Sequence, residues 1–436
     1  MAFDSLYLSD RLARFPRPRA WCVGFSGGGD SVALLHALVA IPGELPAGLP
    51  VRAIHIHHGL LADADDWENH CRDVCGELDV ALVVVRVDVS ETAGQGPEDA
   101  ARRARYSAFE DQLGAGECLL LAHHRDDQAE TLLLQLFRGA GPRGLAGMPA
   151  WRELGRGFLA RPLLDINRCE LVQYNETHGL QWVEDPSNAD PRFRRTQVRE
   201  ILLPQMESQW PGVTQNLARS ARLCGEATEI LRECAARDLA SVATADISVL
   251  DTGQLSRLSS ARRRNLLRHW FDVLDLPVPH ERHLDRVVDE VIGARADAEP
   301  CICWSGVEVR RFRDQLHAMA PLVKGDANWS GRWDLSGELN LPGSAGVLVA
   351  TGRALDEPVE VGFRQGGERL RPEGGRHTRE LKTLFQEAGV PPWQRERMPL
   401  IRRRDRLLAV ADLWMSGEFS EELRESGAGY RWTPGC

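Results

Sequence analysis

The sequence predicts an α/β protein, with a parallel sheet in the N-terminal half followed by two smaller α+β domains. Up to about residue 180, short apolar runs of strand length alternate with segments of helical periodicity, which is typical of βαβ units. Beyond residue 329 the pattern changes to short strands and glycine turns. The chain has 436 residues, enough for about three domains at roughly 150 residues each.

The N-terminal alternation defines five strands and the helices between them. Val32 and Leu35 begin a helical spacing after the first strand. Pro97 opens a later helix, where its missing N–H costs nothing, and Asn167 with Glu170 forms a capping signature for the last one. Because crossovers are right-handed, the loops that follow the strands lie at one edge of the sheet. The expected strands are 21–25, 51–56, 81–87, 118–122 and 158–163.

A long helix expected over 213–239, with one apolar stripe, separates this half from the rest of the chain. Two or three helices and short strands follow it, and a further helix is expected over 378–388. The resulting parts are an N-terminal domain over 1–212, a linker helix over 213–240, a middle domain over 241–325 and a C-terminal domain over 326–436.

Composition excludes several classes of protein. No apolar run approaches the roughly 20 residues that cross a bilayer, and residues 1–19 lack a continuous apolar stretch of secretory type. A net charge of −10 argues against a protein coated in positive charge. Ten scattered cysteines in a chain of this length indicate reduced thiols rather than a disulfide framework. We therefore expect a cytoplasmic enzyme without a membrane partner, and the sequence leaves its oligomeric state unknown.

Three loops at the expected sheet edge carry groups suited to chemistry. Because they follow different strands, their convergence predicts one site where they meet. The first loop is Ser26-Gly27-Gly28-Gly29-Asp30-Ser31, the second holds His57, His58 and Gly59 just after His55, and the fourth holds His123, His124, Asp126, Asp127 and Glu130.

The first loop suits an anion. Successive glycines let the backbone approach a ligand and turn its N–H groups outward, and the following helix N-terminus adds positive charge. Ser26 and Ser31 add hydroxyl donors, whereas Asp30 would repel a phosphate unless it orients Mg²⁺ or a cationic nucleophile. A Walker-type loop is excluded, because it needs a lysine beside its glycines and the chain has only Lys324 and Lys382. The alternative is a tight turn with an N-cap.

Asp127 and Glu130 lie three residues apart at a helix start and so share one face. Two carboxylates over a nucleotide site can hold an ammonium group or a metal ion. The alternative is that acidic residues in a first turn only offset the helix dipole.

The first loop, Ser-Gly-Gly-x-Asp-Ser after a strand, resembles the PP-loop of the ATP pyrophosphatases, which cleave ATP between the α- and β-phosphates. Within that group the sequence is most similar to the tRNA(Ile)-lysidine synthetase family, and the assignment depends on 126–131 and on the C-terminal block. The resemblance covers most of 20–205 and of 361–401. The segments that carry it are 57–60, 101–106, 122–131 (Ala-His-His-Arg-Asp-Asp-Gln-Ala-Glu-Thr), 137–139, 161–164, 184–188, 363–372 and 381–400.

The resemblance implies a PP-loop fold of the adenine nucleotide α hydrolase type, with ATP binding and catalysis in 1–212 and tRNA binding in the two later domains. It implies a ligase that uses ATP and Mg²⁺ to join L-lysine to C2 of the wobble cytidine of a tRNA(Ile) with a CAU anticodon. The cytosine C2 oxygen attacks the α-phosphate of ATP, and the lysine ε-amine then displaces AMP.

The resemblance also implies roles for particular residues. Asp127 and Glu130 would bind the incoming lysine, and Asp30, between lysine and ATP, is the candidate Mg²⁺ ligand; these three are the candidate catalytic residues. The expected ATP-binding residues are Ser26, Gly27, Gly28, Gly29, Asp30 and Ser31, and the candidate lysine or tRNA contacts are Arg102, Arg105, His123, Arg195 and Arg199.

Simpler interpretations remain open for several of these residues. Arg102 and Arg105 are equally typical of a solvated basic helix face, and the same holds for Arg195 and Arg199. A zinc site among the clustered histidines is disfavoured, because no cysteine pair or HExxH helix accompanies them.

Charge is distributed unevenly in the C-terminal part. Residues 361–410 hold 12 Lys+Arg and 6 Asp+Glu, a local net charge of +6 that suits an RNA backbone. The helix around 262–270, with three successive arginines, could lie on RNA or be a solvated face.

Two other functions compete with the ligase. One is a PP-loop tRNA cytidine thiolase, although such enzymes tend to use paired cysteines and no CxxC pair exists here. The other is a non-catalytic, ATP-gated RNA-binding protein. A glutamine-dependent amide synthetase would need a nucleophilic cysteine domain, which is not found.

Overall fold

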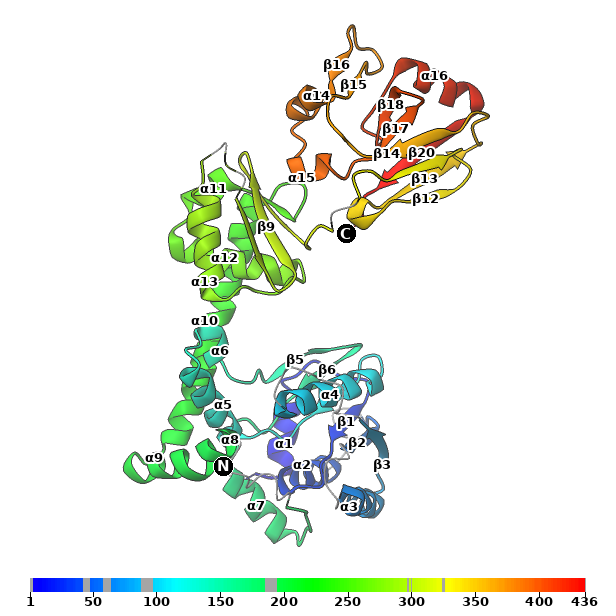
Figure 1. The fold of residues 1–436 in the computed structure, drawn as a ribbon. Helices are drawn as coiled ribbons and strands as arrows, with labels where there is room; N and C mark the ends of the chain where they lie inside the picture. Colours follow the sequence, from blue (N-terminus) through cyan, green and yellow to red (C-terminus); the bar gives the residue numbers. More distant parts are fainter. Residues whose placement is uncertain are drawn as a thin grey trace. The chain divides into compact units, whose positions relative to one another are not determined.

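The computed structural model describes residues 3–41, 48–57, 64–87, 97–184, 194–295, 298, 300–323 and 326–435. The chain divides into two units, Met1–Leu231 and Arg232–Cys436 (Figure 1). Each unit has its own hydrophobic core and is described here by itself.

The first unit is built on a six-stranded sheet in the order β3-β2-β1-β4-β6-β5. The five strands expected from the sequence are present and parallel, which confirms the predicted class. A sixth strand, β5, was not expected; it pairs antiparallel with β6 at the sheet edge through a turn at Gly155, whose φ is +53°. The strands are β1 (Trp21–Gly24), β2 (Val51–His57), β3 (Ala81–Arg86), β4 (Cys118–Leu120), β5 (Trp151–Leu154) and β6 (Gly157–Ala160).

Helices cover both faces of this sheet. On one face, Leu8, Leu35 and Leu171 from three helices pack into a common core with Trp21 and Val23 of β1. On the other face, Phe109 of α4 and Leu113, directly after this helix, pack against β4 and β6. The helices are α1 (Ser5–Leu12), α2 (Gly29–Val39), α3 (Ala64–Glu77), α4 (Pro97–Gln112), α5 (Arg125–Phe137), α6 (Pro142–Leu145) and α7 (Arg168–Thr177).

A helical segment follows the sheet. It runs through α8 (Arg194–Gln197), a π-helical turn (Val198–Leu202) and α9 (Leu203–Gln209) to the long α10 (Val213–Val242). The helix expected over 213–239 is therefore confirmed, and it extends across the boundary between the two units.

The second unit begins with an antiparallel sheet in the order β7-β10-β9-β8, covered on one face by helices. Trp270 and Phe271 are fully buried between the helices and the sheet. The elements are β7 (Val249–Asp251), α11 (Thr252–Arg257), α12 (Ser260–Val273), α13 (Glu281–Arg286), a π-helical turn (Val287–Ile292), β8 (Cys301–Trp304), β9 (Val307–Phe312) and β10 (Gln315–Met319).

The C-terminal part of the second unit contains three antiparallel sheets, β11-β14-β17-β18-β19, β12-β13-β20 and β15-β16. The helix expected over 378–388 is α14, and α15 and α16 are additional. Its strands are β11 (Ser330–Trp333), β12 (Glu338–Asn340), β13 (Val347–Gly352), β14 (Val359–Gly362), β15 (Arg369–Leu370), β16 (Arg379–Glu380), β17 (Leu400–Arg403), β18 (Arg406–Val410), β19 (Trp414–Met415) and β20 (Ala428–Thr433). Its helices are a 3₁₀ turn (Gly343–Ala345), α14 (Leu381–Glu387), α15 (Pro392–Arg395) and α16 (Gly417–Ser426).

Two expectations from composition concern the whole chain. Among the described residues, no helix is long and apolar enough to cross a membrane. Each cysteine that the structure describes is a free thiol.

Candidate active site

The loop from residue 26 to residue 31 joins β1 to α2. Gly27 has a φ of +79°, a left-handed conformation that favours glycine. The Ser31 hydroxyl donates to the Gly28 carbonyl over 2.9 Å and lies 3.1 Å from the Ser26 hydroxyl, so the two serines close the loop. The N-terminus of α2 then presents N–H groups and the positive end of its dipole. This local structure has the backbone geometry that the predicted anion cradle requires.

A cavity of about 650 Å³ lies beside β2 and the loops after β1 and β4, and its volume suits a small ligand. Its wall is partly apolar, with Ile54, Ile56, Phe109 and Leu121 beside Gly24. Among the described candidate residues, the cavity brings together Ser26, Gly28, Gly29, Asp30, Ser31, Arg102, Arg105, His123, Asp127 and Arg199, and does not include Gly27, Glu130 or Arg195 in its wall.

The two carboxylates of α5 are paired with two arginines from the segment after the sheet. Arg195 donates to Glu130 over 2.7 Å and to Asp127 over 2.9 Å. Arg199 donates to the same carboxylates over 2.6 Å and 3.2 Å. The Glu130 side chain is completely buried, whereas that of Asp127 is 10% exposed and lines the cavity. The sequence places both carboxylates on one helix face, and the structure distinguishes them by their access to the cavity.

This pairing perturbs the ionisation of the network. Burial alone would raise the pKa of Asp127, but the positive charges of His124 and Arg195 hold it well below its usual range. Burial would likewise lower the pKa of Arg195, and the charges of Asp127 and Glu130 raise it instead. Asp127 is therefore a permanent anion at the cavity wall, suited to holding a cation.

His124 lies between three carboxylates. Its Nε2 is 3.5 Å from Asp30 and 3.5 Å from Asp127, and its Nδ1 is 3.4 Å from Asp126. Burial would lower the pKa of His124, but Asp127, Asp126 and Asp30 together raise it to about 10. His124 is thus an imidazolium at neutral pH and links Asp30 of the first loop to Asp127 of α5.

The neighbouring His123 has the opposite character. Burial lowers its pKa to about 3, more than the Asp127 charge raises it, so its imidazole is neutral. Its Nδ1 accepts a hydrogen bond from Arg161 Nε over 3.2 Å, which leaves Nε2 to carry the proton. His123 therefore offers the cavity a neutral N–H donor.

Among the described residues, this cluster consists of four carboxylates and three cations. Asp30, Asp126, Asp127 and Glu130 lie close to Arg195, Arg199 and His124. Of the four carboxylates, Asp30 and Asp127 line the cavity, where they are suited to bind a cationic group or a metal ion.

Arginine side chains gather around Tyr106, which lines another part of the wall. Arg102 lies over the Tyr106 ring with its guanidinium carbon 5.2 Å from the ring centroid, and Arg152 lies 5.3 Å from the same centroid. Arg161 donates to the Tyr106 hydroxyl over 3.1 Å. Arg105 and Arg168 also line the cavity. This concentration of positive charge suits the phosphates of a nucleotide.

Four residues at the site were not singled out from the sequence. Asn175 of α7 donates from Nδ2 to the Gly29 carbonyl over 2.9 Å and so ties α7 to the first loop. Trp182 and Arg168 line the cavity, and Arg161 orients His123. Arg161 lies in the segment 161–164 that carries the resemblance, which is the one sequence signal that marks it; the others have no local pattern.

Some candidate residues lie elsewhere. His58, Gly59 and residues 185–188 are outside the described residues. His57 lies 3.2 Å from Asp65 and does not line the cavity, whereas His55 does line it and contacts the Phe25 carbonyl through Nδ1 at 2.9 Å. His57, Asp65 and Glu68 come close enough to share a metal ion, but both carboxylate oxygens of Glu68 already accept hydrogen bonds, Oε1 from Arg72 and Oε2 from Arg86.

Comparisons with known proteins find matches over most of the chain. Family models match in three places: a PP-loop domain at 6–206, a TilS substrate binding domain at 250–317 and a TilS substrate C-terminal domain at 359–432. A tRNA(Ile)-lysidine synthase of Xanthomonas campestris pv. campestris (strain 8004) is 41% identical over 417 residues, 95% of each chain. The chain belongs to the tRNA(Ile)-lysidine synthase family.

Further tRNA(Ile)-lysidine synthases match over a similar length. That of Alkalilimnicola ehrlichii is 42% identical and covers 95% of this chain and 94% of its own. That of Pseudomonas syringae pv. tomato is 44% identical and covers 93% and 91%. The resemblance derived from the sequence is confirmed, and the TilS substrate binding domain extends the match to 250–317, outside the segments that carried the resemblance.

Proposed function

We propose that this protein joins the ε-amine of L-lysine to C2 of the wobble cytidine of a tRNA(Ile) with a CAU anticodon, using ATP and releasing AMP and pyrophosphate. The observation that carries the proposal is one cavity that brings the glycine loop at the N-terminus of α2 together with the carboxylates of Asp30 and Asp127. A nucleotide and a cationic nucleophile could therefore meet there.

In the first step, the cytosine C2 oxygen attacks the α-phosphate of ATP and pyrophosphate leaves. The N-terminus of α2 and the hydroxyls of Ser26 and Ser31 would donate to the phosphate oxygens. Arg102 and Arg105 would offset the charge that develops on the departing pyrophosphate. Asp30 fits a Mg²⁺ ligand, because its carboxylate is a hard oxygen donor 38% exposed in the cavity; a bound Mg²⁺ would supply further charge neutralisation at the phosphates.

In the second step, the lysine amine attacks C2, a C–N bond forms, and AMP leaves with the former C2 oxygen. A free amine of this type has a pKa near ~10.4, so it arrives as a cation and must lose a proton first. Asp127 would hold the cation because its own proton affinity is low. Asp30, which contacts His124 but neither Arg195 nor Arg199, would receive the proton from the amine.

Glu130 would act through other residues. It is fully buried and holds Arg195 and Arg199, which in turn contact Asp127. We therefore assign Glu130, Arg195 and Arg199 to positioning the Asp127 carboxylate. His123 would donate its Nε2 proton to the base or to the nucleotide.

The rest of the chain would bind the tRNA. We propose that catalysis lies in 1–212, that 213–240 is a linker helix, and that 241–325 and 326–436 contact the tRNA. The reaction would take place in the cytoplasm, where free lysine, ATP and newly made tRNA occur together.

The experiment is incubation of the purified protein with ATP, Mg²⁺, radiolabelled lysine and an unmodified tRNA(Ile) transcript with a CAU anticodon. The expected result is label in the tRNA, with AMP and pyrophosphate released in equal amounts. The same transcript with uridine at the wobble position is the control and should take up no label. Pyrophosphate release without label would indicate another nucleophile, and absence of both products would indicate a binding protein.

A further inference from the structure

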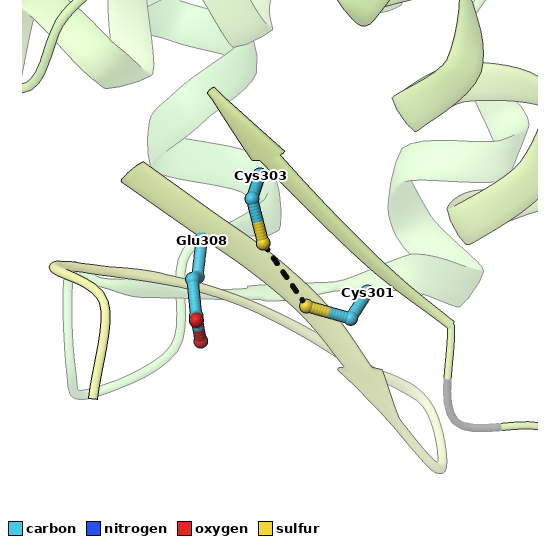
Figure 2. Close-up of side chains that lie close together, drawn as sticks. All are labelled: Cys301, Cys303 and Glu308. Atoms are coloured by element: carbon cyan, nitrogen blue, oxygen red, sulfur yellow. Dashed lines mark hydrogen bonds between the residues drawn. The ribbon is translucent and has the colours of Figure 1, made fainter. Parts of the chain in front are cut away.

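Two exposed cysteines lie side by side on the second unit, far along the sequence from the candidate active site. Cys301 and Cys303 are on β8, an edge strand of the β7-β10-β9-β8 sheet, with their sulfurs 3.6 Å apart (Figure 2). Ile302 and Trp304 of the same strand are buried in the core, so both thiols point to the opposite face of the sheet. Glu308 of β9 is the cross-strand partner of Cys303 and lies on the thiols' face.

The spacing of the two sulfurs matches that of two thiolates on one zinc ion. At a Zn–S distance of ≈ 2.3 Å and a tetrahedral angle, two sulfurs are about 3.8 Å apart. One carboxylate oxygen of Glu308 and both sulfurs lie within 4.8 Å of one another. Two thiolates and a carboxylate are ligands that zinc accepts, with water in the fourth position.

The strand geometry disfavours a disulfide between the same residues. Positions i and i+2 of a strand are separated by two rises, about 6.6 Å between Cα atoms. That is near the upper end of the range for disulfides, roughly 4.4–6.8 Å, and the sulfurs would have to approach to about 2.05 Å. A zinc ion could bind between the two sulfurs without such a movement of β8, because they already have the required spacing.

The neighbouring Arg310 completes the charge balance. Arg310 of β9 is the cross-strand partner of Cys301, and its Nε donates to Glu308 Oε2 over 2.9 Å. Two thiolates and one carboxylate on a divalent ion leave one negative charge, which this guanidinium offsets. Carboxylates that bind metal ions in proteins are usually oriented by such a hydrogen bond from a neighbouring residue.

We propose that Cys301, Cys303 and Glu308 form a binding site for one Zn²⁺ ion on the outer face of the β8–β9 pair. The thiols give up their protons as the ion binds. The ion fastens the edge strand β8 to β9 through side chains in addition to the ladder of backbone hydrogen bonds. The site is independent of the proposed reaction, because none of its residues lines the cavity described above.

The test is a Co²⁺ titration of the full-length protein, reduced, stripped with a chelator and kept anaerobic, followed by displacement with Zn²⁺. The expected result is one equivalent of Co²⁺ with a thiolate-to-cobalt charge-transfer band, which Zn²⁺ abolishes. Cys301→Ser and Cys303→Ser should each remove this band. Cys169→Ser, which removes an exposed free cysteine of α7, is the matched control and should retain it. Arg310→Gln should weaken the binding by about 10–100-fold.

Several results would overturn the proposal. One is a protein that shows no charge-transfer band although circular dichroism shows it folded. Another is a band that survives in the Cys301→Ser/Cys303→Ser double variant or that disappears equally in Cys169→Ser. A third is a reduced protein that binds no metal but forms a Cys301–Cys303 disulfide with hydrogen peroxide, detected by mass spectrometry of the peptide.

Discussion

At the scale of single residues, Asp127 separates lysine binding from adenylation. Its carboxylate faces the cavity and is the acceptor of both Arg195 and Arg199. Asp127→Asn keeps the shape but removes the charge that would hold the lysine cation. A hydrogen bond to a charged group contributes about 1.5–3 kcal/mol, so kcat/KM for lysine should fall by roughly 10–100-fold. Lysine-independent pyrophosphate release, measured with the same tRNA, should fall much less.

The adjacent Asp126 provides the control. It is on the same helical turn, but one of its oxygens accepts from the Arg168 N–H over 3.0 Å and it does not line the cavity. Asp126→Asn should leave the KM for lysine close to that of the wild type. Equal losses of lysine transfer in the two variants would contradict the role given to Asp127.

His124 makes the stability of the first unit depend on pH. Its pKa is raised to about 10 in the folded protein, against about 6.5 in an unfolded chain. The folded state therefore holds a proton that the unfolded state loses, and this contribution is complete below pH ~6.5 and disappears as the pH rises to about 10. Between these two pH values, the free energy of unfolding falls by up to about 1.4 kcal/mol per pH unit.

Urea unfolding at a series of pH values measures this dependence. His124→Gln should be less stable at pH 6.5 and should have a flatter slope between pH 6.5 and 10. His377→Gln, at an exposed position, should keep the slope of the wild type. A wild-type slope in His124→Gln would mean that other groups carry the dependence.

At the scale of elements, the loop between β1 and α2 depends on the backbone of Gly27. A Cβ there would lie 2.9 Å from Cys71 Sγ, and the positive φ would add strain of about 1–2 kcal/mol. Gly27→Ala should therefore lower the free energy of unfolding by at least that amount and weaken ATP binding. Gly76→Ala is a control with the opposite expected sign. Gly76 lies in α3 with open space around it, and alanine stabilises a helix by roughly 0.5–1 kcal/mol relative to glycine. Chemical denaturation and ATP titration of both variants check the signs.

The elements also show what a sequence can predict. The parallel strands were predictable because each is a local apolar run between helical patterns, as in Ala81–Arg86. Strand β5 was not predictable, because the residues of Trp151–Leu154 are mostly exposed and the strand forms by pairing with β6. The anion loop followed from its glycines, but the pairing of Glu130 with Arg195 and Arg199 joins positions 65 and 69 residues apart. No local pattern encodes such a contact, so the sequence could not show that Glu130 is buried and Asp127 accessible.

At the scale of the whole molecule, the candidate catalytic cavity belongs entirely to the first unit, and the segment of +6 charge belongs entirely to the second. Within that segment Arg369, Arg376 and Lys382 are exposed. Exposed cations bind RNA mainly through phosphates, and each contact releases counterions from the backbone. The second unit should therefore contribute salt-dependent tRNA affinity, separate from the chemical steps.

Neutralising the three cations tests this division. In the variant Arg369→Gln/Arg376→Gln/Lys382→Gln, the tRNA dissociation constant should rise and the slope of log K against log salt should become shallower by up to about three. Filter binding of tRNA(Ile) at several salt concentrations gives both quantities. At saturating tRNA, the turnover of bound tRNA should stay close to the wild-type value, because the cavity is unchanged. Glu380→Gln, which removes an exposed negative charge from the same segment, should shift the affinity the other way. An unchanged salt slope in the triple variant would show that this surface does not contact the RNA backbone.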